Sequence, residues 1–245
     1  THYKIADPDL VREAIQAMSE PAPLVEREMP GDLFDSIVGY PDVKTLVRYA
    51  LEAEKPAHLL LSGPPASAKT MFLLELRRLP QSYYALATTL TAAGLADILF
   101  VYEPRFILID EVERLSPEHI GVLNSLMATG IVSETKHGKT RELELDTRVF
   151  AAGIKVEKLP HDLLSRFTKL HFAPYTEQEF IEVSQRVLTT RENTSLDNAE
   201  YIARVLWQTH GQNADVRQCV QIARLSQGDR LKIDEVLEVL RKYGK

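Results

Sequence analysis

The sequence predicts an α/β fold, with a mostly parallel sheet covered by helices on both faces, followed by a small all-helical domain. Between residues 58 and 172, short apolar runs alternate with stretches of helical spacing. This order is typical of parallel strands joined by helices. Beyond Pro174 the strand-like runs stop and only helical spacing remains, which predicts the helical domain.

The N-terminal segment is expected to be a helix followed by a linker. Residues 9–19 carry apolar side chains at helical spacing, and residues 20–32 hold three prolines and a glycine, which break helix and strand. We therefore divide the chain into three parts. They are an N-terminal helix and linker (1–31), an α/β domain (32–174) and a helical lid domain (175–245).

The individual elements follow from the same patterns. The expected strands are 58–62, 82–87, 105–110, 148–153 and 168–172. The expected helices of the last domain are 176–190, 196–209, 213–225 and 233–242. Residues 130–145 alternate on both sides of a His-Gly pair. This predicts a β-hairpin, because glycine adopts the positive φ of a tight turn most easily.

The composition is that of an ordinary folded protein, with 44% hydrophobic and 26% charged residues among 245. A net charge of -6 argues against a surface that binds nucleic acid everywhere, although it does not exclude a local basic feature. Cys219 is the only cysteine, which excludes an internal disulfide and fits a reducing compartment. No apolar run approaches the roughly 18 residues of a membrane span, so we expect no membrane partner and a cytoplasmic protein.

A phosphate-binding loop follows the first strand. Its residues are Gly63, Pro64, Pro65, Ala66, Ser67, Ala68, Lys69 and Thr70, and Met71 continues into the next helix. They match the pattern G-x-x-x-x-G-K-[ST], except that Ala68 replaces the second glycine. A loop between a strand and a helix N-terminus directs backbone N–H groups at an anion. We expect Lys69 to contact the β- and γ-phosphates of ATP and Thr70 to ligate Mg²⁺.

Two carboxylates end a later buried strand, at Asp110 and Glu111. Ligands of open α/β sheets bind at the carboxyl ends of the strands, so these residues can share one crevice with the phosphate-binding loop. Asp110 suits the Mg²⁺ shell, and Glu111 could act as general base toward the attacking water. The ordinary alternative is an acidic start of the next helix.

Together these motifs, the segment Leu163-Leu164-Ser165-Arg166-Phe167 and the helical tail resemble the AAA+ ATPase family from Phe34 onward. Ala68, residues 88–95 and residues 159–167 are similar to MCM helicases, whereas the compact length looks like RuvB or MoxR-type proteins. The resemblance implies an ATP-hydrolysing motor module that acts in a ring, as a homo-hexamer or another oligomer.

The resemblance also implies roles for four further residues. Arg166 matches the arginine finger that completes the site of a neighbouring subunit, and Arg217 resembles the sensor 2 arginine that contacts the γ-phosphate. Ile37 and Val38 match the region that receives adenine. Each has a simple alternative. Arg166 could be an ordinary surface arginine, Arg217 could belong to an ordinary helix start, and Ile37 and Val38 could serve core packing alone.

In the hairpin branch of the family, the segment 130–145 would project toward the central channel of the ring. Lys136 and Lys139 flank its tip and are possible contacts to a polymer, or ordinary solvated lysines.

The sequence departs from the family at the position called sensor 1. In the family this is usually a polar residue, Asn or Thr, which follows the strand that corresponds to 148–153 and helps to orient the attacking water. Ile154 and Lys155 stand there, and the side chain of isoleucine cannot form hydrogen bonds. Three explanations remain open: Lys155 takes the place of the polar sensor 1 residue, the alignment with the family is shifted by one residue, or ATP hydrolysis is slow.

Three functions remain open from the sequence. The first is a DNA helicase or translocase of the MCM or RuvB type, although the acidic net charge argues against it. The second is a MoxR-like ATPase that remodels a protein substrate. The third is a nucleotide-gated regulatory subunit with weak hydrolysis, which Ile154 favours.

Overall fold

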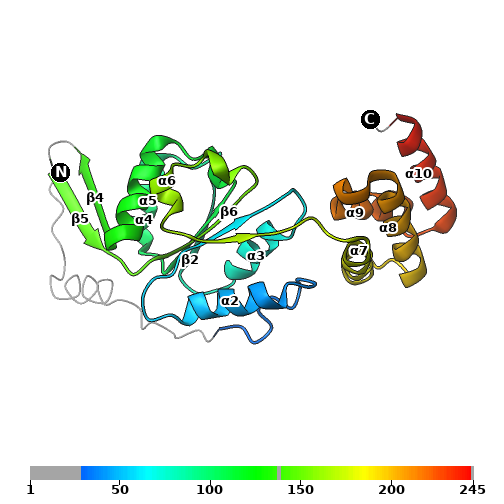
Figure 1. The fold of residues 1–245 in the computed structure, drawn as a ribbon, viewed down its shortest axis with the longest axis horizontal. Coiled ribbons are helices and arrows are strands. Elements are labelled where there is room, and N and C mark those ends of the chain that lie inside the picture. The colour runs from blue at the N-terminus through cyan, green and yellow to red at the C-terminus, as the bar shows by residue number, and fades with distance from the viewer. Residues whose placement is uncertain (1–28, 137–138, 244–245) are drawn as a thin grey trace, which may run out of the picture.

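The computed structural model describes residues 29–136 and 139–243. The expected helix 9–19, most of the linker and the His-Gly pair of the hairpin lie outside these residues. A sheet with its helices forms one part of the molecule, and a bundle of helices forms the other (Figure 1).

The sheet has five strands, and all neighbouring pairs are parallel. Its strands are β1 (Leu59–Ser62), β2 (Ser82–Leu86), β3 (Phe106–Asp110), β6 (Arg148–Gly153) and β7 (Thr168–His171). Their spatial order is β2-β3-β6-β1-β7. The expected strands are thus confirmed. Because the strands are parallel, their carboxyl ends share one edge, and the loops that follow β1, β3 and β6 meet there.

Helices cover both faces of the sheet (Figure 1). They are α2 (Pro41–Glu52), α3 (Lys69–Leu76), α4 (Ala92–Tyr102), α5 (Pro117–Thr129) and α6 (His161–Leu164). In β1, Leu59 and Leu61 pack into the core that contains α2 and α3, whereas Leu60 packs into the core that contains α4 and α5. Successive side chains of a strand point to opposite faces, so each apolar run contributes to both cores.

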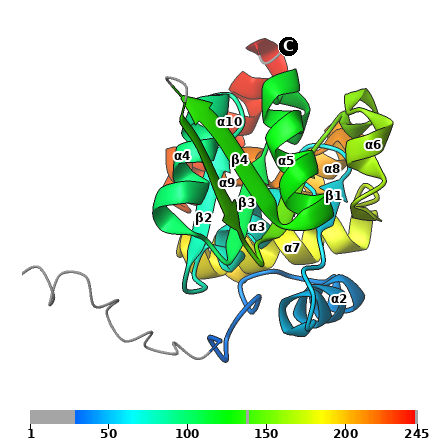
Figure 2. The ribbon, with the colours of Figure 1, turned by 90° about the vertical axis from the view of Figure 1, so that its left-hand side faces the viewer.

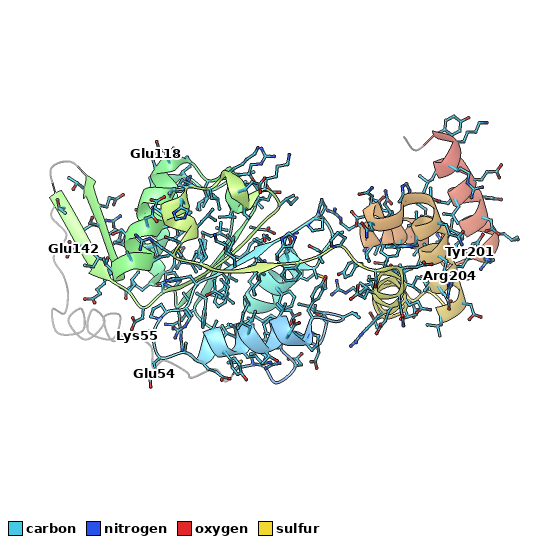
Figure 3. All side chains as sticks on the ribbon, in the orientation of Figure 1. Glu54, Lys55, Glu118, Glu142, Tyr201 and Arg204 are labelled. Atoms are coloured by element: carbon cyan, nitrogen blue, oxygen red, sulfur yellow. The ribbon has the colours of Figure 1, made fainter. Side chains whose placement is uncertain are left out.

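The predicted hairpin is confirmed as an antiparallel pair, β4 (Ile131–Lys136) and β5 (Lys139–Glu144). Figure 2 shows it in front of α4 and α5. Arg141 anchors it: its guanidinium pairs with Asp97 of α4 at 2.7 Å and lies 4.0 Å from the centre of the Phe100 ring. The hairpin, with Glu142, lies at the opposite end of the molecule from the lid residues Tyr201 and Arg204 (Figure 3).

The helical part consists of α7 (Glu177–Arg191), α8 (Leu196–His210), α9 (Val216–Ser226) and α10 (Arg230–Tyr243). It has a hydrophobic core of its own, which includes Phe180, Ile202 and Ile222. The division of the chain at residue 174 remains a proposal, which this separate core supports. Among the described helices, none has the length and apolar character needed to cross a bilayer.

Two helix starts in the lid differ from the sequence prediction. Helix α9 begins three residues later than expected, because residues 211–213 form a short 3₁₀ helix and Asp215 then caps α9 by accepting a hydrogen bond from Arg217 N. Helix α10 begins three residues earlier, because the Asp229 carboxylate accepts a hydrogen bond from Lys232 N at 3.0 Å. Such a side-chain cap stabilises the first turn of a helix.

Candidate functional site

The loop between β1 and α3 contains three residues with positive φ, a backbone conformation that is unfavourable for most residues. Gly63 has a φ of +143°, and a Cβ atom there would lie 2.4 Å from the Phe172 carbonyl oxygen. Ala66 and Ala68 have φ values of 61° and 62°. Ala68 therefore adopts the left-handed conformation expected of the glycine that it replaces, at a cost of roughly 1–2 kcal/mol.

Lys69 is buried, and its ammonium group turns into the loop. Its Nζ donates hydrogen bonds to Gly63 O at 2.9 Å, Pro64 O at 2.5 Å and Ser67 Oγ at 2.9 Å. Ala68, the residue before α3, provides no side-chain cap for the helix. The N–H groups of the first turn have no intrahelical acceptors, so the loop presents a cation and a helix N-terminus to the same space, an arrangement that favours an anion.

The electrostatic surroundings of Lys69 are unusual for a lysine. Burial lowers its pKa to about 8, while the nearby Asp110 and Glu113 carboxylates oppose this shift and Arg217 adds to it. A lysine with this pKa changes charge close to neutral pH. Strong perturbation of this kind, in a cleft, is common at functional sites.

The end of β3 meets the loop. The Thr70 hydroxyl donates to Asp110 Oδ2 at 2.8 Å, and the Tyr84 hydroxyl approaches the same oxygen at 3.2 Å. Asp110 is 8% exposed. The structure thus brings together the two residues that the sequence assigned to Mg²⁺, and it adds Tyr84, which no motif indicated. Burial and the Asp110 charge raise the pKa of Tyr84 to about 12, so its hydroxyl remains a donor.

Glu111 follows Asp110 at this edge of the sheet. It is exposed, with a φ of 55°, so its carboxylate is accessible to solvent. Ile154 follows β6 at the same edge and is 46% exposed. Its backbone N–H donates to the Glu113 carboxylate at 3.3 Å, and a Cβ on Gly153 would lie 2.4 Å from Glu113 Oε2. Glu113 is therefore the polar side chain next to the sensor 1 position.

A cleft of about 340 Å³ separates the phosphate-binding loop from the lid. Residues 66–71 line one side. The lid lines the other with Val187, Arg191, Asp215, Val216, Arg217 and Val220. The Arg217 guanidinium is held by Asp215 at 2.6 and 2.9 Å. The lid arginine predicted from the sequence therefore faces the loop. Sequence reasoning missed Arg191, because its place in the cleft depends on how the lid packs.

The residues assigned to adenine lie in the core beside the loop. Ile37 is 1% exposed and Val38 is 9% exposed, and neither lines the cleft. Protein already covers nearly all of their side-chain surface, so a base would meet mainly backbone there. Pro64 and Pro65 also lie outside the cleft lining, although Pro64 O binds Lys69.

Arg166 lies at the opposite edge of the sheet. It lies two residues before Thr168, the first residue of β7, which donates its N–H to the carbonyl of His58, the residue before β1. Burial lowers the pKa of His58, and the charge of Arg166 contributes to this shift. The Arg166 side chain is exposed, and its Nε donates to Asn124 Oδ1 at 3.0 Å. The cleft and Arg166 are thus separated by the length of the strands.

Lys136 and Lys139 close the ends of β4 and β5, facing each other in the register of the hairpin. Their side chains lie outside the described residues. The predicted contact to a polymer stays a prediction.

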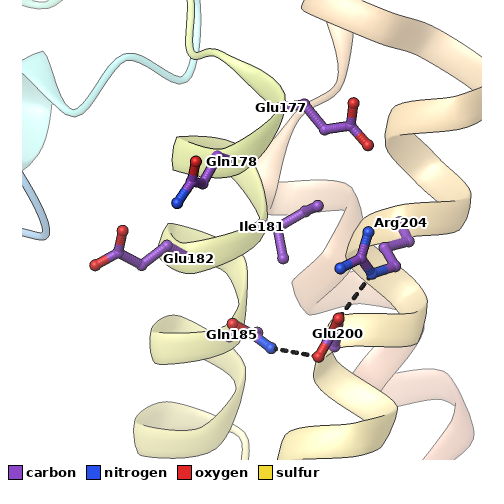
Figure 4. Close-up of a pocket in the computed structure, with 7 residues that line it drawn as sticks. All are labelled: Glu177, Gln178, Ile181, Glu182, Gln185, Glu200 and Arg204. Atoms are coloured by element: carbon purple, nitrogen blue, oxygen red, sulfur yellow. Dashed lines mark hydrogen bonds and ion pairs between the residues drawn. The ribbon is translucent and has the colours of Figure 1, made fainter.

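A second cleft, of about 590 Å³, lies on the lid between α7 and α8. Glu200 lines it and accepts hydrogen bonds from Gln185 at 3.0 Å and Arg204 at 2.7 Å (Figure 4). Glu177 and Glu182 line the same cleft. Three glutamates against one arginine give this lining a net negative charge, which repels phosphate groups and makes the cleft unsuited to a nucleotide.

Comparisons with known proteins give a fold but no relative in sequence. No family model and no curated protein matches the chain. Solved structures of RuvB from Thermotoga maritima are similar. One, described as a Holliday junction branch migration motor, has a TM-score of 0.60 and 21% identity, and the match covers 84% of this chain and 71% of that chain. A mutant of the same protein has a TM-score of 0.63 at 21% identity with the same coverage. At this identity the similarity establishes the fold alone, a parallel sheet flanked by helices and followed by a helical region.

Proposed function

We propose that this chain binds Mg·ATP in the cleft between the phosphate-binding loop and the lid, and hydrolyses it as an AAA+ motor module acting in a ring. The observation that carries the proposal is the convergence of Lys69, the Thr70–Asp110 pair and Arg217 on one cleft. These residues come from three separate segments of the chain. Each has the charge or hydrogen-bonding group that is needed to bind a nucleoside triphosphate with its metal ion.

The residues around the loop fit ATP and Mg²⁺. The Lys69 ammonium and the N-terminus of α3 would bind the β- and γ-phosphates. The Thr70 hydroxyl and the Asp110 carboxylate are hard oxygen ligands only 2.8 Å apart. Mg²⁺ is usually held in this way, by one or two protein groups together with phosphates and water. The ion would neutralise charge on the transferring phosphoryl group.

Two further residues would act on the reaction. Glu111 extends beyond β3 next to Asp110 and is accessible to solvent, so it can accept a proton from the attacking water. Arg217 reaches the cleft from the lid, so its charge would couple the position of the lid to the γ-phosphate. Asp215 orients the Arg217 guanidinium through three hydrogen bonds.

The place of Arg166 supports ring assembly. β6 has six residues, so it spans about 20 Å at roughly 3.3 Å per residue. Arg166 lies beyond the amino ends of the strands, whereas the cleft lies beyond their carboxyl ends. An arginine side chain cannot bridge that distance within its own subunit. Arg166 would therefore act on the nucleotide of a neighbour, as an arginine finger does.

The three candidate functions differ in the substrate on which the protein would act. The similarity to RuvB and the hairpin at the end far from the lid support a DNA motor. The net charge of -6 favours a protein substrate, and Ile154 favours a regulatory subunit with weak hydrolysis. ATPase rates measured with single-stranded DNA, with duplex DNA and without polymer separate these. Stimulation by DNA supports the motor, and an unchanged rate contradicts it.

Mixing two inactive variants tests the ring. Arg166→Ala is expected to bind ATP normally but to lose activity by a factor on the order of 10³, whereas Lys69→Ala loses its own site. In mixed assemblies, an intact loop can face an intact finger, so ATPase activity should return. No recovery at any ratio, with assembly confirmed by light scattering, would count against catalysis in trans.

A further inference from the structure

We propose that Asn124 is a positioning residue for Arg166, which holds the guanidinium in place without neutralising its charge. The inference rests on the proposed role of Arg166 as a finger for the neighbouring subunit. Asn124 lies on α5, which precedes the hairpin, whereas Arg166 follows α6. The two residues are 42 positions apart in the sequence, and no motif connects them.

A chain of two hydrogen bonds fixes the Asn124 amide. Arg166 Nε donates to Asn124 Oδ1 at 3.0 Å, and Asn124 Nδ2 donates to Asp162 Oδ2 at 2.7 Å. A flipped amide would set its NH₂ against the guanidinium N–H and its oxygen against the carboxylate, and both contacts would be repulsive. Asp162 therefore selects the orientation in which the carbonyl oxygen meets Arg166.

The contact uses only the Nε of Arg166. In the part of the chain that the structure describes, the two terminal nitrogens of this guanidinium have no recorded hydrogen bond or ion pair, and the side chain is exposed. The group is thus held at its base, while its outer edge is accessible to solvent. An outer edge with free donors is what a phosphoryl group on another subunit would require.

Arg217 provides an internal contrast. Asp215 Oδ2 accepts hydrogen bonds from Arg217 Nε at 2.9 Å and from a terminal nitrogen at 2.6 Å, and Asp215 Oδ1 accepts from Nε at 3.1 Å. A carboxylate takes two guanidinium donors and offsets the charge. The neutral carbonyl of Asn124 takes one donor and leaves the positive charge of Arg166 in place. The choice of an amide at position 124 therefore suits a cation that has to act elsewhere.

The test measures ATP turnover of Asn124→Ala alone and in the Arg166→Ala background. Losing a hydrogen bond to a charged group should lower kcat by roughly ten- to a hundredfold. KM for Mg·ATP should stay within about twofold, because a finger stabilises the charge that develops on the transferring phosphoryl group rather than ground-state binding. If Asn124 acts through Arg166, the double variant should have the same kcat as Arg166→Ala.

Asn198→Ala is the matched control. Asn198 donates to Gly228 O at 2.9 Å and accepts from Arg230 at 3.4 Å, so it has similar contacts in the lid, and its loss should leave kcat unchanged. Light scattering confirms that every variant assembles like the parent. A parental kcat for Asn124→Ala, while Arg166→Ala is inactive, would overturn the inference. So would a further loss in the double variant. A parental kcat for Arg166→Ala would instead overturn the finger assignment itself.

Discussion

Affinity for Mg·ATP should fall as the pH rises above neutrality, because Lys69 must be charged to bind phosphate. Its pKa in the free protein is about 8, lowered mainly by burial. Bound phosphates stabilise the ammonium form and raise this pKa, so binding above pH 8 requires the uptake of a proton. From these values, the dissociation constant should rise about tenfold between pH 7 and pH 9.

Isothermal titration calorimetry in buffers with different ionisation enthalpies measures both the dissociation constant and the number of protons taken up per ATP bound. The expected proton uptake is about 0.5 at pH 8 and about 0.9 at pH 9. Lys69→Arg is the control, since arginine stays charged over this range, and its affinity should not vary with pH. An unchanged dissociation constant for the parent from pH 7 to pH 9, without proton uptake, would refute the role of Lys69.

The same shift has the opposite sign for the stability of the free protein. The pKa of Lys69 is lowered in the folded state, so between about pH 8 and pH 10.4 the unfolded chain binds more protons than the folded one. The contribution of this group to the free energy of unfolding therefore rises with pH. Weaker nucleotide binding at high pH thus cannot be attributed to Lys69-driven unfolding.

Three substitutions test other parts of the site. Glu111→Gln should keep Mg·ATP binding but lower kcat by about 10²-fold or more, because an amide cannot accept the proton of the water; equal turnover would place the base elsewhere. Thr70→Ala should weaken the dependence of ATP affinity on Mg²⁺, since it removes a ligand oxygen; an unchanged Mg²⁺ titration would contradict this. Ala68→Gly should keep binding and raise the free energy of unfolding in urea by up to about 1 kcal/mol, because glycine accepts a φ of 62° without strain; lower stability would show that the loop is not strained at Ala68.

The centre of the sheet could be predicted from the sequence because its strands β1, β3 and β6 are buried on both faces. β3 and β6 are buried at every position, so they read as continuous apolar runs bounded by polar residues. The positions of the loop 63–70 and of Asp110, at the carboxyl ends of two strands, could be predicted for a related reason. Each lies at a fixed place relative to a strand, and the parallel topology brings the carboxyl ends of the strands together.

Other parts of the site depend on contacts that no local pattern encodes. Arg191 enters the cleft only because the lid packs against the loop. Glu113 reaches the sensor 1 position through a hydrogen bond to Ile154 N, made possible by the absence of a side chain on Gly153. Asn124 meets Arg166 across two helices. Such contacts arise from tertiary packing, so residue type and spacing along the chain could not reveal them.

Binding of Mg·ATP to the parent and to Lys69→Ala tests the central proposal most directly. Lys69 is the only side-chain cation in the loop, and losing its charge-assisted hydrogen bonds should weaken binding by about 10²-fold. Lys169→Ala, which removes an exposed lysine from β7, is the matched control and should bind like the parent. Circular dichroism verifies that both variants are folded. Loss of affinity in Lys69→Ala alone is the predicted result, whereas parental affinity in a folded Lys69→Ala would contradict nucleotide binding at this loop.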